Sequence, residues 1–461
     1  MGRVVCAIVL VFSCLCATVF AAENVADDPL REMALDALRE LDEVEAVPFE
    51  RTDHPNAQWF PQAGFGLFMH WGIHSVAGIQ PSWSMIKDYP YGTDKTEYHG
   101  KGYYTLLDKF DPQKYDPDAW IRAAAEAGMS YAVLTAKHHD GYALWPSEYG
   151  DMSTKQYLDG RDLLRPYIDA CRKYGLKVGL YFSPRDWGYP GFPMSMVHQQ
   201  PWVDPFNRSQ EQLEEDFEAF YAYTVGQISE LLTRYGKIDI IWFDGMGWTG
   251  NVDIRTEKTL AWVRRLQPHI IINPRWGGVG DYDTPEWNMP EETPDDWWEN
   301  CISWSGHWGY SPDSPVQPVD WVIGKLVTAR AWGGNFLLNI GPAPDGTMRP
   351  EYYERTAELA RWMKHSKESL IGTEGVRNWK EFSTVPLTSR GRTWYLHLLP
   401  DTSASVEIRD VSRPKSVKLL RTNEPVAYAY ENAALRIIIP GDLRKTVDDV
   451  IAVEWHTVPK H

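Results

Sequence analysis

The feature that most constrains this chain is a repeated alternation of short apolar segments, polar loops and helical segments between about residues 55 and 366. The apolar segments are hydrophobic on both faces, which is typical of parallel strands covered by helices. At least six are present, and no GxGxxG motif follows the first. The pattern predicts an α/β fold of the (β/α)8-type barrel class. The expected strands are 64–72, 130–141, 177–184, 238–245, 270–276 and 335–342, and the expected helices are 116–127, 161–174 and 209–235.

The pattern of polar and apolar residues changes after about residue 370. Segments such as TWYLHLLP, SVEIRDV and ALRIIIP are short, alternating and rich in β-branched residues, and turn residues separate them. This pattern predicts a small antiparallel β-sandwich. We therefore expect a barrel domain at residues 55–370 and a C-terminal β-sandwich at 371–461.

The first 22 residues have the pattern of a secretory signal peptide. Arg3 precedes an apolar run at 4–20, and two alanines end the segment before the chain turns polar. The run is shorter than the about 20 residues that a membrane-spanning helix needs. Phe12 fits poorly in a lipid-attachment site at Cys14, which disfavours a lipoprotein. We expect a soluble mature protein, secreted or periplasmic, that begins with a helical segment at 23–54.

Charge and cysteine content narrow the functional classes. The formal net charge is −17 and no basic residues cluster, which disfavours a nucleic-acid partner. Outside the signal peptide only Cys171 and Cys301 remain, and we predict no disulfide between them. The 22 Trp and 24 Tyr residues are mostly core, yet such rings beside polar groups are also what a sugar site needs. The sequence carries no signal for an oligomeric state.

Polar side chains follow nearly every predicted strand, where barrel enzymes place their chemistry. Asp244 is the sharpest case, because a carboxylate after the buried run IDIIWF is costly unless it is hydrogen-bonded or paired. A helix N-cap is the structural alternative for this residue. The other strand-end groups are His70, His138, His139, Asp140, Tyr181, Trp242 and Arg275.

A second carboxyl group is needed if Asp244 is a glycosidase nucleophile, and the sequence offers several. Glu286 lies between Pro285 and Trp287, where desolvation by the aromatic ring would raise its pKa. The pair at 291–292 and Glu299 are also candidates, and the residues alone do not choose between them.

Two other chemistries find little support. His138 and His139 invite a metal site, but neighbouring residues on a strand point to opposite faces, so both would bind one ion only if the backbone bends there. No HExxH motif is present. We therefore predict neutral hydrogen-bonding imidazoles, no metal and no organic cofactor. No GxSxG motif supports a serine nucleophile.

The motifs GFGLFMHWGIHS, TAKHHDGYALW, GLYFSP, IIWFDG, NPRW, TPEW and GGNFLLNIGPAPDG, in this order, resemble glycoside hydrolase family 29, the retaining α-L-fucosidases. The resemblance covers about residues 55–375. It implies a distorted (β/α)8 barrel followed by a β-sandwich, with Asp244 as nucleophile and Glu286 as acid/base. It also implies sugar-binding roles for His70, Trp83, His138, His139, Tyr181, Trp242 and Arg275. Many members have Glu-Trp where this chain has Ser82-Trp83, so this chain lacks a carboxylate that would accept hydrogen bonds from sugar hydroxyls.

The resemblance implies a retaining, exo-acting α-L-fucosidase that removes terminal fucose from oligosaccharides or glycoconjugates by double displacement. Two alternatives stay open. Ser82 is compatible with a related sugar such as an α-L-galactoside, and the chain is also compatible with a sugar-binding protein that has lost catalysis.

Overall fold

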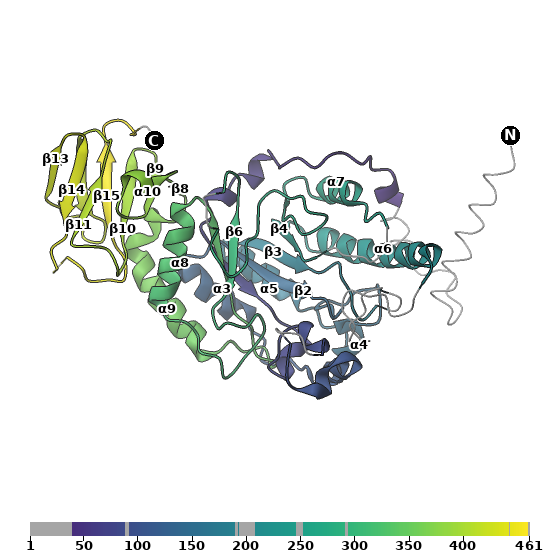
Figure 1. The fold of residues 1–461 in the computed structure, drawn as a ribbon. Helices are drawn as coiled ribbons and strands as arrows, with labels where there is room; N and C mark the ends of the chain where they lie inside the picture. The colour runs from purple at the N-terminus through teal and green to yellow at the C-terminus, as the bar shows by residue number, and fades with distance from the viewer. Residues whose placement is uncertain are drawn as a thin grey trace, which may run out of the picture.

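The computed structural model describes residues 39–87, 92–189, 192, 208–245, 252–290, 294–441 and 443–459. A sheet of parallel strands surrounded by helices forms the larger part, and two antiparallel sheets form a smaller body at the C-terminal end (Figure 1). The predicted signal peptide at 1–22 lies outside the described residues. Of the helical segment predicted within 23–54, residues 39–42 are helical and the chain is irregular from 45 to 54.

Seven parallel strands form the main sheet, in the order β5-β4-β3-β2-β1-β7-β6. Nearly every residue in them is buried, as expected for strands apolar on both faces. Each of the six predicted strands contains one of them. The strands are β1 Phe65–Met69, β2 Tyr131–Lys137, β3 Lys177–Phe182, β4 Ile240–Phe243, β5 Ile271–Ile272, β6 Glu299–Ser303 and β7 Asn335–Asn339.

The structure adds one strand that the hydrophobic pattern did not predict. β6 begins with the polar residues Glu299 and Asn300, yet all five of its residues are buried. Segment 281–286 then hydrogen bonds to both edge strands. The Asp281 N–H donates to the Ile272 carbonyl at 2.7 Å, and parallel bridges pair Asp283 with Trp298 and Glu286 with Cys301.

The helices begin and end where local sequence signals place them. The Asp116 carboxylate caps α3 and Pro117 opens it, while α5 ends at Gly175, which adopts a left-handed φ of 74°. Ser209 and Gln212 form a capping box at the start of α6. The helices are α3 Pro117–Glu126, α4 Thr154–Tyr157, α5 Leu164–Tyr174, α6 Gln210–Thr233, α7 Thr256–Leu266, α8 Val319–Ala331, α9 Pro350–Ser366 and α10 Trp379–Phe382.

The C-terminal body contains a five-stranded sheet, β12-β15-β10-β9-β8, and a three-stranded sheet, β11-β14-β13, both antiparallel. Their inward-facing residues share one hydrophobic cluster, which makes them the two layers of a sandwich. The strands are β8 Glu374–Gly375, β9 Leu387–Arg390, β10 Thr393–Leu398, β11 Ser405–Ile408, β12 Pro414–Leu419, β13 Tyr428–Glu431, β14 Ala434–Ile438 and β15 Asp449–Trp455.

Two smaller expectations can be compared directly with the structure. Cys171 and Cys301 are both buried free thiols, as predicted. Within the described part of the chain, no helix is both long and apolar enough to cross a membrane.

Candidate active site

The side chains that follow the parallel strands meet at one end of the sheet. His70 comes directly after β1, His138 and His139 follow β2, and Asp244 follows β4. Arg275 lies beyond the short strand β5. Because the carboxyl ends of parallel strands lie at the same end of the sheet, five groups from four distant segments of the sequence converge there.

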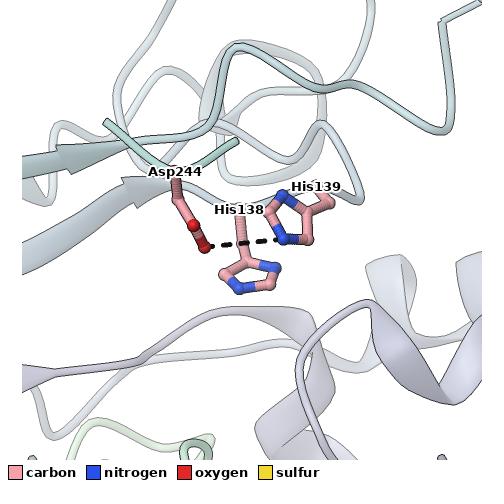
Figure 2. Close-up of side chains that lie close together, drawn as sticks. All are labelled: His138, His139 and Asp244. Atoms are coloured by element: carbon pink, nitrogen blue, oxygen red, sulfur yellow. Dashed lines mark ion pairs between the residues drawn. The ribbon is translucent and has the colours of Figure 1, made fainter. Parts of the chain in front are cut away.

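Asp244 lies at the centre of this group. Its Oδ1 lies 3.0 Å from Arg275 Nη1, and its Oδ2 accepts a 2.6 Å hydrogen bond from the Tyr181 hydroxyl. The Oδ2 atom also lies 3.6 Å from His139 Nε2 (Figure 2). Burial would raise the pKa of Asp244, but the charge of Arg275 and the hydrogen bond from Tyr181 outweigh it and bring the pKa to about 2. The carboxyl group is therefore ionised at neutral pH.

Glu286 is the second carboxyl group at this end of the sheet. Its Oε1 lies 2.5 Å from Arg275 Nη2, so one guanidinium group contacts both Glu286 and Asp244. Burial raises the pKa of Glu286, and the negative charge of Asp244 adds to this effect against the opposing Arg275. The pKa values of the two carboxyl groups are thus moved in opposite directions, which is the division that acid/base and nucleophile roles require.

An aromatic stack supports the charged groups. The Tyr181 ring stacks on Trp242 at 5.5 Å and on His138 at 5.3 Å. The Arg275 guanidinium lies over the Trp242 ring of this stack, 4.5 Å from the ring centroid. Trp83 is half-buried and meets His139 edge-on at 5.7 Å. The rings and cations fix each other's position, because cation–π and stacked contacts both prefer defined geometry.

Glu299 lies in a different environment from Glu286. It is the first residue of β6 and fully buried, and its carboxyl group accepts hydrogen bonds from the Tyr131 hydroxyl and the Trp242 indole. The pair at 291–292 lies outside the described residues. Glu286 is therefore the candidate acid that contacts the same guanidinium as Asp244 and keeps 35% of its side chain exposed.

Comparison with known proteins places this constellation in a family. The sequence model of the family described as Alpha-L-fucosidase matches residues 41–368, which is well over half of the chain. The chain belongs to the α-L-fucosidase family. It is 30% identical to the human tissue α-L-fucosidase over 366 residues, which covers 74% of this chain and 75% of the human protein. The bovine tissue α-L-fucosidase is 29% identical over 369 residues and covers 75% of each chain.

Solved structures of α-L-fucosidases resemble the fold as well. The α-L-fucosidase isoenzyme 1 of Paenibacillus thiaminolyticus superposes with a TM-score of 0.76 at 29% identity, covering 87% of this chain and 98% of that one. The Thermotoga maritima α-fucosidase in complex with a mechanism-based inhibitor gives a TM-score of 0.71 at 26% identity, covering 87% and 97%.

Several polar residues that hold this α-L-fucosidase site together were not singled out from the sequence. Asn339, in the LLNIGP motif at the end of β7, lies 2.7 Å from His70 Nδ1. Ser183, directly after β3, lies 2.6 Å from His139 Nδ1. Asn339 is the last residue of β7 and Ser183 directly follows β3, so the strand-end rule that identified the histidines also applied to them.

Ser82, the position that departs from the usual Glu-Trp pair of the family, is fully buried. Its hydroxyl contacts both His138 Nδ1 and the carboxylate of Asp140. Ser82 also adopts a left-handed φ of 55°, a conformation that L-residues rarely take. A bulkier side chain would meet these same buried partners, so the surroundings of this position are built for a small hydroxyl.

Trp287 and Trp308 add two more aromatic rings beside Glu286. Their centroids are 4.9 Å apart, and Trp308 lies 5.1 Å from His70. Trp287 adopts a φ of 61°, which is strained for a bulky residue and is a feature that clusters at functional sites.

The two adjacent histidines do not follow the strand geometry assumed from the sequence. β2 ends at Lys137, and the turn that follows brings both rings beside Asp244 with centroids 4.1 Å apart (Figure 2). One ligand atom from each of His138, His139 and Asp244 lies within 4.8 Å of the others. The two side chains therefore lie on the same side because the backbone turns after β2, which is the bend that the strand argument had left as the exception.

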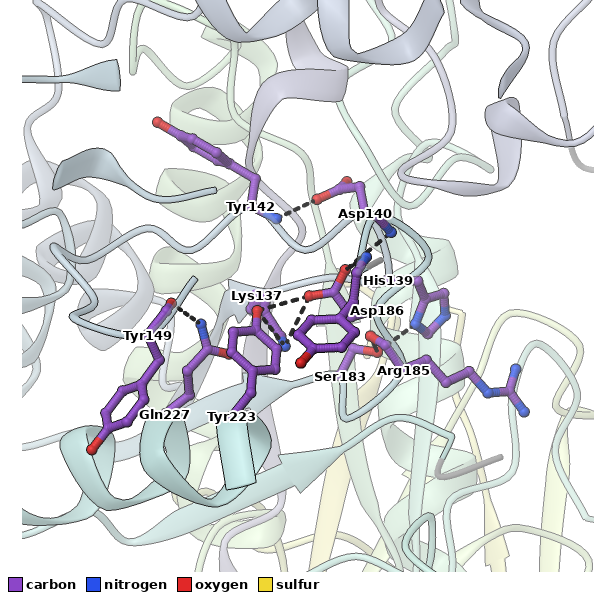
Figure 3. A network of polar contacts seen from close by, with 12 residues as sticks. Lys137, His139, Asp140, Tyr142, Tyr149, Ser183, Arg185, Asp186, Tyr223 and Gln227 are labelled. Atoms are coloured by element: carbon purple, nitrogen blue, oxygen red, sulfur yellow. Dashed lines mark hydrogen bonds and ion pairs between the residues drawn. The ribbon is translucent and has the colours of Figure 1, made fainter. Parts of the chain in front are cut away.

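A buried charge network supports this turn from behind. Lys137 is fully buried and its Nζ lies 3.5 Å from Asp186 Oδ2, which also accepts a hydrogen bond from the Tyr223 hydroxyl (Figure 3). Burial lowers the pKa of Lys137 to about 8, although Asp186 opposes the shift. The network joins the end of β2 to the loop after β3 and to α6, and so fixes the position of both histidines.

Proposed function

We propose that this chain is a retaining, exo-acting α-L-fucosidase that hydrolyses terminal α-L-fucose from oligosaccharides and glycoconjugates by double displacement. The observation that carries the proposal is the contact of one guanidinium, Arg275, with both Asp244 and Glu286. Retaining glycosidases need two carboxyl groups about 5–5.5 Å apart, one ionised and one protonated. Two carboxyl groups on one guanidinium with oppositely shifted pKa values are compatible with that requirement.

Each residue has a role in the proposed reaction. Asp244 attacks the anomeric carbon while Glu286 gives its proton to the glycosidic oxygen, and the bond to the leaving group breaks. Glu286 then removes a proton from water, which attacks the glycosyl-enzyme ester and releases fucose and the Asp244 carboxylate. Arg275 keeps Asp244 ionised between turnovers and limits its movement. No step in this sequence requires a metal or an organic cofactor.

The geometry of the same end of the sheet supports the remaining proposed roles. We assign the acid/base role to Glu286 rather than Glu299. The residues that bind the sugar ring and its hydroxyls are then His70, Trp83, His138, His139, Tyr181, Trp242 and Arg275. Segment 281–286, which hydrogen bonds to both edge strands, would take the place of the eighth strand of a (β/α)8-type barrel. We further propose a secreted or periplasmic protein with a cleaved signal peptide at 1–22, and domains at 55–370 and 371–461.

Azide rescue of two alanine variants tests the proposal. Asp244→Ala should lower kcat on an aryl α-L-fucoside by on the order of 10⁴-fold or more. Added azide should then yield the β-L-fucosyl azide, because azide attacks from the face that the carboxylate occupied. Glu286→Ala with azide should yield the α-L-fucosyl azide, because azide attacks the glycosyl-enzyme. The exposed residues Asp253 and Glu257 provide matched alanine controls.

Three results would contradict the proposal. If the Asp244→Ala variant keeps substantial activity that azide does not increase, Asp244 is not the nucleophile. If a substrate panel shows a strong preference for an α-L-galactoside over an α-L-fucoside, the proposed substrate is wrong and the enzyme is an α-L-galactosidase. Binding of fucosides without product release would identify a sugar-binding protein instead of an enzyme.

A further inference from the structure

We propose that three buried polar side chains fix the tautomers of the three histidines at the sugar site, so that each imidazole offers Nε2 as a hydrogen-bond acceptor to a sugar hydroxyl. The inference rests on the proposed function for its ligand. The positioning residues are Asn339 for His70, Ser82 for His138 and Ser183 for His139. The assignment follows from counting donors and acceptors at each pair.

The first pair is His70 and Asn339. The Asn339 Nδ2 group donates to the carbonyl oxygens of Trp308 at 2.7 Å and His307 at 3.4 Å. The amide must therefore turn its Oδ1 toward His70, since the opposite orientation would place oxygen against two carbonyls. Because Oδ1 only accepts, the proton of the 2.7 Å contact lies on His70 Nδ1. The Nε2 atom of neutral His70 then carries a lone pair.

The second pair is His139 and Ser183. The Ser183 hydroxyl has one proton, and it donates to the carbonyl oxygen of Arg185 at 2.8 Å. The only other oxygen within reach among the described residues is the Asp244 carbonyl at 3.4 Å, which is also an acceptor. With its proton on the Arg185 carbonyl, Ser183 is assigned as the acceptor from His139 Nδ1 at 2.6 Å. His139 Nε2, 3.6 Å from Asp244 Oδ2, is left as an acceptor facing an acceptor.

The third pair is His138 and Ser82, and here every valence of the hydroxyl is used. Ser82 Oγ accepts from the Asp140 N–H at 2.8 Å and donates to Asp140 Oδ2 at 3.0 Å. The Asp140 carboxylate also accepts from the Tyr103 hydroxyl and the Tyr142 N–H, which is the pattern of an ionised group. The remaining lone pair of Ser82 accepts from His138 Nδ1 at 2.6 Å. His138 Nε2 is again left without a proton.

The three imidazoles are neutral as well as fixed in orientation. Burial lowers the pKa of His70 to about 4 and that of His139 to about 3, and it lowers the pKa of His138 well below its usual value. Within the described part of the chain, none of the three Nε2 atoms makes a hydrogen bond. A ligand that supplies several hydroxyl donors on one ring satisfies them all, and it also resolves the contact between His139 Nε2 and Asp244. A pyranose with free hydroxyls is such a ligand.

Nitrogen-15 NMR of the full chain labelled at histidine tests the tautomers directly. The spectrum of each ring is assigned by its loss in His70→Gln, His138→Gln and His139→Gln. We expect a protonated Nδ1 and an unprotonated Nε2 in all three, with the exposed His456 as a reference ring free to exchange. A protonated Nε2 in any of the three would overturn the proposal. The measurement needs no turnover, so it is decided separately from the fucosidase activity.

A serine variant tests whether the positioning residue sets the tautomer. Ser183→Ala should move the His139 signals toward exchanging tautomers and raise KM for an aryl α-L-fucoside about tenfold, with a smaller change in kcat. Ser183→Thr, which keeps the hydroxyl, should restore both. Ser147→Ala removes another buried serine hydroxyl, which donates to Glu230, and controls for a general loss of packing. A rise in KM in Ser183→Ala with unchanged His139 signals would assign Ser183 a structural role only and overturn the proposal.

Modified sugars test the acceptor role itself. Fluorine accepts hydrogen bonds weakly but cannot donate, so a site of acceptors should not distinguish a deoxyfluoro sugar from the deoxy sugar. We expect 3- and 4-deoxyfluoro-L-fucose to bind as tightly as the deoxy analogues or up to about twofold more weakly, as measured by their inhibition constants. Fluoro sugars that bind more than about fivefold tighter than the deoxy sugars would indicate Nε2–H donors and overturn the proposal. Failure of the wild type to cleave the aryl fucoside would count against the proposed function instead.

Discussion

The hydroxyl of Tyr131 donates a 2.5 Å hydrogen bond to the carboxyl group of Glu299. The indole of Trp242 donates to the other carboxyl oxygen at 3.1 Å, and Trp242 in turn carries the Arg275 guanidinium on its ring. Glu299 therefore supports the site from beneath the aromatic stack, while Glu286 contacts Arg275 directly. Both acids were candidates for proton transfer on sequence grounds, and their surroundings differ.

The first prediction concerns the activity of Glu299→Gln. The amide can still accept from one donor and the Tyr131 hydroxyl can rotate to accept from it, so the stack should persist. We expect kcat/KM on methyl α-L-fucoside to fall less than about fivefold. Glu286→Gln should lower it by about 10²–10⁴-fold, because this substrate needs a proton donor. If kcat/KM falls equally in the two variants, Glu299 is again a candidate proton donor.

The second prediction concerns the stability of the same variant. Burial raises the pKa of Glu299 from 4.5 to about 7, against the hydrogen bonds from Tyr131 and Trp242. A raised folded-state pKa means that the folded protein binds the proton more tightly than the unfolded chain. The contribution to stability is therefore complete below pH 4.5 and is lost as the pH rises through 7, by about 3 kcal/mol in all. Thermal denaturation of wild type and Glu299→Gln should show their difference shifting in favour of the variant between pH 4.5 and 8.

The third prediction concerns the pH dependence of catalysis. Because the pKa of Asp244 is about 2 and that of Glu286 is raised, the active form has Asp244 ionised and Glu286 protonated. On methyl α-L-fucoside, kcat/KM should fall as the pH rises through the pKa of Glu286. On α-L-fucosyl fluoride, whose leaving group needs no proton, this alkaline limb should be absent. An identical alkaline limb on both substrates would assign the titration to another group.

The fourth prediction concerns Arg275→Lys. An ammonium group cannot contact two carboxyl groups in a fork or lie flat on Trp242, so Asp244 loses its strongest stabilising charge contact. We expect kcat/KM to fall by about 10²–10³-fold. The pKa of Asp244 should rise, so that an acid limb appears in the pH profile. Arg255→Lys is the matched control, because the Arg255 guanidinium lies 4.7 Å from the Tyr221 ring without contacting either acid.

Much of this architecture was predictable because local signals agree with the fold. Strands apolar on both faces, separated by capped helices, indicated the parallel sheet, and the polar residue after each strand indicated where the site lies. Asp244 stood out since a carboxylate beside the buried run IDIIWF needs a partner, and the structure supplies Arg275 and Tyr181.

What the sequence did not yield depends on contacts between distant residues. β6 was missed because Glu299 and Asn300 look like loop residues. The Tyr131 and Trp242 donors make the burial of Glu299 tolerable, and the Asn300 amide donates to the carbonyl oxygens of Pro285 and Asn288. The role of Ser82 was equally hidden, since its partner His138 is 56 residues away in sequence. Hydrophobic periodicity reports which face is buried and carries no information on which polar groups meet there.

The last prediction concerns added metal ions. His138, His139 and Asp244 each offer one ligand atom within 4.8 Å of the others, and imidazole and carboxylate groups are ligand types that zinc binds. Asp244 already has Arg275 and Tyr181 as partners, and the proposed reaction uses the carboxylate itself as nucleophile, so activity should not depend on a metal. EDTA should therefore leave kcat/KM unchanged, while Zn²⁺ should inhibit competitively with substrate by occupying Asp244.

Two controls make the metal test decisive. Mg²⁺ and Ca²⁺ prefer oxygen ligands and should not inhibit at the same concentration, whereas Zn²⁺ binds imidazole well. Excess EDTA added after Zn²⁺ should restore the full rate, because the inhibition requires only occupation of the Asp244 carboxylate and the lone pair of His139. Loss of activity on EDTA treatment, restored by one particular metal, would instead make the cluster a working metal centre and remove Asp244 from its role as a free nucleophile.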